Sequence, residues 1–390
     1  PVPGPATGPA ITGSCVTFLP WRARWTPVAT AWAATPAAVP TATGHPSHDG
    51  TDARHNQALR RDWANFTALT FLFMFGFAVY NGVFQNFLRE TLHATPLDLG
   101  RLESLREVPG LLAALMAGVV ASLAEARVAG LGLLITGIGM GLTGHMPGYW
   151  SLVGISVLWS VGFHLYTGVA PAITLALAKG EEGGRHLGRM TAVGSVATIT
   201  GLGFALALAK MAPNLGYAFY FHLSGACILA AAYLCARLST HAAGAPRARL
   251  ILRKEYGLYY LLVFLEGCRR QIFSIFASFT LIAVYGVPLK QMLALQFINA
   301  IMIAVTAPRM GRAVDRLGQR GPLLVYAVGL IAVFVGYATI PNRWVLAGLF
   351  LLDNVLFTFG VAFTTYLHRI VRPAELTPCL AMGLTMNHVA

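Results

Sequence analysis

The chain has 390 residues, of which 56% are hydrophobic and only 11% are charged, and its formal net charge is +13. Soluble domains usually carry about 25% charged residues, so the composition argues against a water-soluble protein. A positive net charge is typical of nucleic-acid-binding proteins, but these lysines and arginines lie in alternate gaps between apolar stretches and not on one face. We therefore expect no nucleic-acid partner and a chain that lies in a lipid bilayer.

Residues 1–60 differ from the rest of the chain. Most of this segment is rich in Pro, Ala, Thr and Gly and has no hydrophobic periodicity. Such a composition buries too little apolar surface to fold alone. The segment also lacks the charged start and apolar core of a signal peptide. We expect residues 1–60 to form a disordered, low-complexity tail.

Long apolar stretches follow from Trp63, joined by short connections that make neighbouring helices antiparallel. They predict an all-α membrane protein in which a six-helix bundle (61–236) and a second bundle (256–390) are joined by a basic cytoplasmic linker (237–255). The second bundle would hold helices seven to ten and part of an eleventh. The predicted helices cover residues 63–88, 99–124, 128–144, 149–178, 187–209, 217–236, 256–284, 289–308, 322–340 and 344–368, and a stretch that begins near Pro378.

The distribution of basic residues predicts the orientation of these helices, because cytoplasmic loops carry an excess of Lys and Arg. With a cytoplasmic amino terminus, eighteen of them from Arg54 onward lie in cytoplasmic segments and five in outer loops. We expect that orientation, in the cytoplasmic membrane of a bacterium. The five outer residues are Arg89, Arg101, Lys210, Lys290 and Arg343.

A basic segment lies between the eighth and ninth predicted helices. Its order of glycines and charges is Gly311-x-x-x-Asp315-Arg316-x-Gly318-x-Arg320. This pattern resembles the loop signature of the major facilitator superfamily of secondary transporters. A solvated charged loop with the same spacing by chance is the alternative interpretation.

The resemblance implies two pseudo-repeated six-helix halves that rock about a central site. The signature glycines would let two helices close tightly, and the aspartate and basic residues would form a charge lock. The first half departs from the signature, because Gly118 is in place but Ser122 stands where the aspartate belongs. The segment 181–197 lines up with the segment 374–390, so we expect the second half to be incomplete and the chain to be a fragment.

Other motifs carry no chemistry. Gly139-x-Gly141-x-x-Gly144 fits a dinucleotide-binding pattern, but it lies in a glycine-rich apolar stretch without a preceding strand, so close helix packing explains it better. There is no phosphate-binding loop and no nucleophile motif, and the five cysteines show no metal-ligand spacing. We expect no enzymatic activity, catalytic residue, cofactor or metal.

Ionisable residues inside predicted helices are costly and are therefore candidate functional residues. Glu266, Arg269 and Arg270 lie in the seventh helix, and the two arginines are about 17 Å from its start, near the middle of a core roughly 30 Å thick. Asp353 and Asn354 reach a similar depth from the other side. They are candidates for substrate binding or coupling, and a balanced structural ion-pair network, including a pair between Glu266 and Arg270, is the alternative.

Further polar candidates follow from the resemblance, which places helices one, four, seven and ten around the central cavity. We expect substrate-binding or coupling roles for Asn81 and Gln85 on helix one and for His164 and Tyr166 on helix four. His164 is a candidate proton carrier, with a packed histidine as the alternative. On helix two, a pair of charges, Arg106 and Glu107, is interpreted as gating or structural. Gln296 and Asn299 on helix eight are interpreted as packing groups.

These features favour a monomeric secondary active transporter that moves a small solute by alternating access. Coupling to a proton and an organic anion as the substrate are hypotheses that the arginines and His164 suggest. A transport-inactive sensor or scaffold with the same fold is the alternative, because the first-half signature is incomplete and the charges at depth are balanced.

Overall fold

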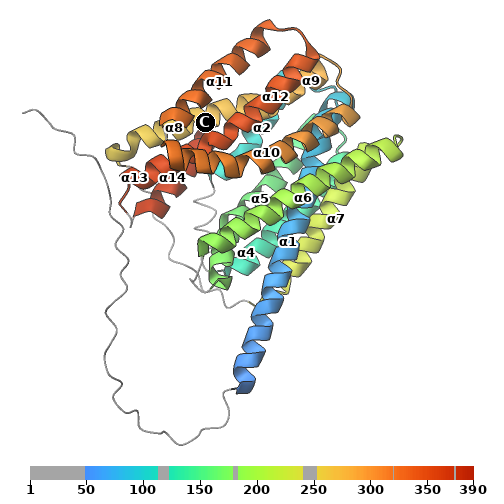
Figure 1. Cartoon of the computed structure of the whole chain (residues 1–390). Coiled ribbons are helices and arrows are strands. Elements are labelled where there is room, and N and C mark those ends of the chain that lie inside the picture. Colours follow the sequence, from blue (N-terminus) through green and yellow to red (C-terminus); the bar gives the residue numbers. More distant parts are fainter. Residues whose placement is uncertain (1–48, 113–122, 179–182, 240–252, 319, 373–374) are drawn as a thin grey trace, which may run out of the picture. The chain divides into compact units, whose positions relative to one another are not determined.

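The computed structural model describes residues 49–112, 123–178, 183–239, 253–318, 320–372 and 375–390. Every regular element in these ranges is helical (Figure 1), which confirms the all-α prediction. Eight helices there are long and apolar enough to cross a membrane. The chain is therefore an integral, multi-pass membrane protein.

The described residues of the first half form six α-helices, and two boundaries differ from the prediction. The first helix begins at Asp49, so residues 49–60, which we expected in the disordered tail, are helical. The second predicted helix is described only at its beginning, and the signature positions Gly118 and Ser122 lie outside the described residues. The helices are α1 (Asp49–Glu90), α2 (Pro96–Leu111), α4 (Glu125–Leu142), α5 (Tyr149–Leu177), α6 (Gly183–Met211) and α7 (Tyr217–Ala236).

The second half has more breaks than the sequence predicts. The helix predicted at 256–284 is divided by a π-helical segment, and the helix predicted at 344–368 is divided by a short 3-10 turn. The eighth helix, by contrast, runs beyond its predicted end at 308. The elements are α8 (Gly257–Gln271), η3 (Ile272–Ala277), α9 (Ser278–Ala283), α10 (Leu289–Leu317), α11 (Arg320–Thr339), α12 (Arg343–Phe357), η4 (Thr358–Gly360), α13 (Val361–Ile370) and α14 (Leu376–Val389).

Local sequence explains where α2 begins and where α10 ends. At the start of α2, the Thr95 hydroxyl accepts from the Asp98 backbone N–H at 3.2 Å, and an Asp98 carboxylate oxygen accepts from the Thr95 N–H at 2.9 Å. The Thr95 hydroxyl also donates to the Asp98 carboxylate at 2.7 Å, and this bond together with the one from the Thr95 N–H holds the pKa of Asp98 below its ordinary value. At the end of α10, Gly318 has φ 75° and ψ −177°, a conformation that is open only to glycine.

Glycines let the helices of the first half approach with backbone against backbone. A Cβ on Gly132 of α4 would lie 2.6 Å from the carbonyl oxygen of Gly162 on α5. A Cβ on Gly139 would lie 2.6 Å from the Trp159 side chain, and one on Gly144 would lie 2.7 Å from Ala218. These close approaches support the interpretation of the glycine motif as a helix-packing feature.

The two halves contact each other through equivalent helices. The fifth helix, α6, packs against the eighth, α10, and the second, α2, packs against the eleventh, α14. Polar contacts also cross between the halves beside α1, where Asn86 Nδ2 donates to the Val287 carbonyl at 3.4 Å. This pairing of helices is the pseudo-symmetry expected of two repeated halves.

Candidate functional site

A cavity of about 630 Å³ lies between helices of both halves. Its size is within the range of small-molecule sites, roughly 300–1,000 Å³. Helices α1, α2, α5 and α6 of the first half line it, and α8, α10, α12 and α14 of the second half complete it. The candidate residues that line it are Asn81, Gln85, Arg106, Glu107, His164, Arg270 and Asn354.

Four of the predicted binding or coupling residues do not line this cavity. Tyr166 is buried in the first half, where its ring packs against Phe73 with 4.5 Å between the ring centroids. Glu266, Arg269 and Asp353 form a separate buried cluster. Tyr166 and His164 share a helix, but a difference of two residues turns their side chains to different faces.

The buried cluster is an ion-pair network around one guanidinium. Arg269 donates to Glu266 at 2.7 and 3.3 Å, and to Asp353 on α12 at 2.6 Å. The three side chains are 7%, 9% and 5% exposed, in the order Arg269, Glu266, Asp353. The expected pair between Glu266 and Arg270 is replaced by this three-residue network, so the structural interpretation fits Arg269 well.

Arg270 has different surroundings. It lines the cavity, and within the described part of the chain no carboxylate pairs with it. Its guanidinium carbon lies 5.4 Å from the centre of the Phe357 ring, a distance at which the ring faces stabilise a cation. The π-helical segment η3 begins two residues later, and such segments are frequent at functional sites.

The amides of α1 have structural partners as well as a place in the cavity wall. Gln85 Nε2 donates to the Ile275 carbonyl at 3.2 Å, and Ser278 Oγ donates to Gln85 Oε1 at 2.6 Å. Gln85 therefore fixes α1 to the π-helical segment and the start of α9. Asn81 and Asn354 each donate to the carbonyl four residues earlier in their own helix.

A cluster of titratable residues on α2, α5 and α14 forms another part of the wall. His388 Nδ1 lies 3.0 Å from Glu107 Oε2, and the rings of His388 and His164 are 5.2 Å apart. Arg106 forms its ion pair with Glu103 and lies 5.3 Å from the centre of the Trp159 ring.

Sequence reasoning missed several residues that line the cavity. His388 carried no signal, because a lone histidine near the end of the chain belongs to no motif. Gln296 and Asn299 were interpreted as packing groups, but both line the cavity, and Asn299 Oδ1 is buried without a hydrogen-bond partner among the described residues. Polar residues that share a helix face were the available signal for both.

The signature residues lie mostly in a helix. Gly311, Asp315 and Arg316 belong to the last turns of α10, Gly318 terminates it, and Arg320 begins α11. Arg316 and Arg320 are exposed. The Asp315 side chain lies outside the described part, so the predicted charge lock stays a prediction.

Comparisons with known proteins give a consistent result. The model of the Major Facilitator Superfamily matches residues 66–388. No curated protein matches the sequence. Among solved structures, the nucleoside transporter NupG is similar, with a TM-score of 0.67 and 14% identity, over 84% of this chain and 88% of that one.

Two further structures show the same fold. A bacterial homologue of the iron transporter ferroportin in the inward-facing state has a TM-score of 0.66 and 14% identity, over 85% of this chain and 90% of that one. A D-xylose–proton symporter has a TM-score of 0.62 and 14% identity, over 84% and 86%. The family match, the paired halves and the apolar helices confirm the resemblance seen in the basic segment. The chain belongs to the major facilitator superfamily of membrane transporters.

Proposed function

We propose that the protein is a secondary active transporter that moves a small organic anion across the cytoplasmic membrane of a bacterium by alternating access. The observation that carries this proposal is Arg270, a guanidinium in the cavity wall that has no carboxylate partner among the described residues. Its neighbour Arg269 is fully used by two acids. An unmatched cation at membrane depth is costly unless a ligand or water compensates it.

The chemistry of the wall favours a carboxylate or phosphate that also carries a hydrogen-bond donor. A guanidinium presents a planar set of N–H donors that binds such anions through two parallel hydrogen bonds. In the same half of the protein, Asn299 Oδ1 on α10 has no donor among the described residues. A hydroxyl or amine on the substrate would satisfy that acceptor.

Alternating access requires contacts between the halves that can break and form again. The contacts beside α1 suit this role, because they are few side-chain hydrogen bonds, from Asn86 to Val287 and between Gln85 and the segment at Ile275 and Ser278. Each such bond contributes only about 0.5–1.5 kcal/mol net.

The solved relatives support a small solute but differ in what they carry. They include a nucleoside transporter, a D-xylose–proton symporter and a peptide transporter. Coupling to a proton is part of our proposal for this chain as well. A pH gradient imposed across proteoliposomes should drive accumulation of the solute, and equal uptake with and without the gradient would rule proton coupling out.

The main experiment is uptake by purified protein in proteoliposomes, with a panel of labelled organic anions beside neutral sugars and nucleosides. We expect uptake of a member of the anion group, and Arg270→Gln should abolish it while the protein stays folded. Arg270→Lys should retain part of it, because the charge remains and the paired hydrogen bonds are lost. Arg343→Gln, at an exposed position at the start of α12, is the matched control and should transport normally.

A sensor or scaffold with the same fold is the rival function. It predicts no counterflow with any solute, although a ligand could still bind and stabilise the protein. Transport of neutral solutes only, with full activity in Arg270→Gln, would contradict the proposed substrate class and leave the transporter assignment standing.

A further inference from the structure

Three potential metal ligands meet in the wall of the cavity. We propose that Glu107, His164 and His388 bind one divalent transition-metal ion of the zinc class. Each residue offers one ligand atom, and the three atoms lie within 4.8 Å of one another. They come from α2, α5 and α14, so the site joins the two halves of the protein.

The protonation of His164 is set by its own helix. His164 Nδ1 lies 2.8 Å from the backbone carbonyl oxygen of Ser160. A carbonyl oxygen only accepts, so Nδ1 carries the proton and Nε2 keeps its lone pair. Histidines that ligate a metal almost always donate their other ring N–H to a carbonyl or carboxylate in this way.

Gly110 has no side chain, and the rings of His164 and His388 approach each other in the space that this leaves. A Cβ on Gly110 would lie 2.6 Å from His164 Nε2 and 2.8 Å from His388 Nδ1. Both nitrogens therefore face the same small volume beside α2. Any side chain at position 110 would occupy it.

Distances and charge suit a small cation. Zinc binds imidazole nitrogen and carboxylate oxygen at about 2.0–2.2 Å, so its ligand atoms must lie roughly 3.3 Å apart. Glu107 Oε2 and His388 Nδ1 are 3.0 Å apart, and small side-chain rotations bring the third atom within reach. Glu107 supplies a negative charge, and the ion pair of Arg106 is with Glu103.

The donor set selects the class of metal. Two imidazoles and one carboxylate suit zinc, cobalt, nickel or ferrous iron, whereas magnesium and calcium prefer oxygen ligands. Three protein ligands leave a fourth position open to water from the cavity. The ion would take the place of the hydrogen bond between His388 Nδ1 and Glu107 Oε2 and would tie α14 to α2 and α5.

The test is metal binding by the purified full-length chain in detergent, after removal of metals with a chelator. Titration with Zn²⁺ by calorimetry should show one ion per chain, and Co²⁺ should give the visible absorption of a site with nitrogen ligands. His388→Ala and Glu107→Gln should each weaken binding by about 100-fold, since even loss of an outer partner of a ligand costs roughly 10–100-fold. Gly110→Ala should weaken it while all three ligands remain.

A second histidine pair in the protein provides the matched control. His145 and His222 have their Nε2 atoms 2.7 Å apart at an exposed position. The double variant His145→Ala with His222→Ala should bind Zn²⁺ as the wild type does. Loss of binding in that variant, or full affinity in His388→Ala, would overturn the proposal.

Chemical protection keeps the test decisive if a variant does not fold. In the wild-type protein, Zn²⁺ should protect His164 and His388 from modification by diethylpyrocarbonate, and Mg²⁺ should not. Absence of this protection overturns the site. None of these measurements uses transport, so the metal site and the anion-transport proposal can fail separately.

Discussion

Arg269 and Arg270 are consecutive residues of α8, yet their guanidinium groups have different surroundings. Successive residues of an α-helix point about 100° apart, so one side chain reaches the acids behind the cavity wall and the other reaches the cavity. Arg269 holds two carboxylates, Glu266 and Asp353. Arg270 contacts an aromatic ring and open space.

This difference predicts opposite effects of the same substitution. Arg269→Gln leaves two buried carboxylates facing each other, and loss of the partner of a buried charge costs about 3–5 kcal/mol. Arg270→Gln removes a charge that forms no ion pair among the described residues and should cost far less. Asp353→Asn should be milder than Arg269→Gln, because Arg269 then still pairs with Glu266. Thermal unfolding of the three variants in one detergent gives the order, and equal stability of the two arginine variants would contradict it.

The sequence predicts how deep in the membrane these residues lie, but not which of them faces the cavity. Counting residues from the helix ends predicts that Arg269, Arg270 and Asp353 lie near the membrane centre, and this depth stays a prediction. Which of them meets the cavity depends on rotation of the helix, and the π-helical segment after Gln271 changes that rotation. Tyr166 was misplaced for the same reason.

At the scale of helices, the end of α10 combines a charged surface with a special backbone conformation. Gly318 adopts φ 75° and ψ −177°, and a Cβ added there would meet nothing within 4 Å, so the constraint is conformational and not steric crowding by neighbours.

Gly318→Ala should therefore destabilise the protein by about 1–3 kcal/mol. Gly321→Ala, in the first turn of α11 and equally free of neighbours, is the control and should be neutral or slightly stabilising, since alanine favours helices. Thermal unfolding compares them. A loss of stability at Gly321 equal to that at Gly318 would show that the helix connection, and not the glycine conformation, matters.

The π-helical segment η3 holds one more residue per turn than an α-helix would. Deletion of Ile272, which is 48% exposed, should convert it to a regular α-helix. Because a π-helical segment accommodates one extra residue in about the same rotation of the chain, the deletion and the conversion compensate, and Arg269 and Arg270 should keep their facing relative to α9.

We expect the deletion variant to insert into membranes and to keep solute uptake, because Arg270 still faces the cavity. Deletion of Leu258, exposed near the start of α8, also keeps the register of the arginines relative to α9 and serves as the control. Loss of uptake in the Ile272 deletion alone would show that the π-helical geometry itself is needed for transport.

Hydropathy located the helices but not their interruptions. Apolar stretches persist through the π-helical segment and through η4, because the side chains there still face lipid or protein and only the backbone hydrogen bonding changes. The extension of α10 to Leu317 was missed for the opposite reason. Charged residues mark where a helix leaves the membrane, and the helix itself continues into water.

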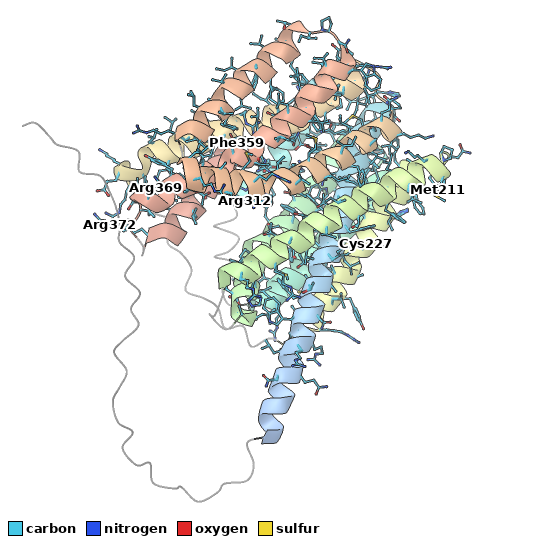
Figure 2. The ribbon with its side chains drawn as sticks, viewed as in Figure 1. Met211, Cys227, Arg312, Phe359, Arg369 and Arg372 are labelled. Atoms are coloured by element: carbon cyan, nitrogen blue, oxygen red, sulfur yellow. The ribbon has the colours of Figure 1, made fainter. Side chains whose placement is uncertain are left out.

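For the molecule as a whole, the distribution of basic residues predicts a cytoplasmic amino terminus. Figure 2 shows Arg369 and Arg372 at one end of the helical unit and Met211 at the other. Met211 is 84% exposed at the end of α6, beside Lys210 in a predicted outer loop, and Arg312 is exposed on α10 near its predicted cytoplasmic end.

Single cysteines in a cysteine-free background test this orientation. Met211→Cys should react with a membrane-impermeant thiol reagent applied to intact cells, and Arg312→Cys should react only after the cells are opened. The reverse pattern would invert the topology. Equal labelling of both sites in intact cells would point to leaky cells, so a known cytoplasmic protein is labelled in parallel.

The contact between Gly132 and Gly162 has a consequence for how this sequence can vary. Where two backbones touch, even one added methyl group forces the helices apart, so only glycine can be accepted at these two positions. On the same helix as Gly162, Gly154 and Gly168 have nothing within 4 Å of a Cβ and should accept most residues. A library that randomises these four codons, selected for folded protein, should return glycine alone at the first two and a mixture at the others.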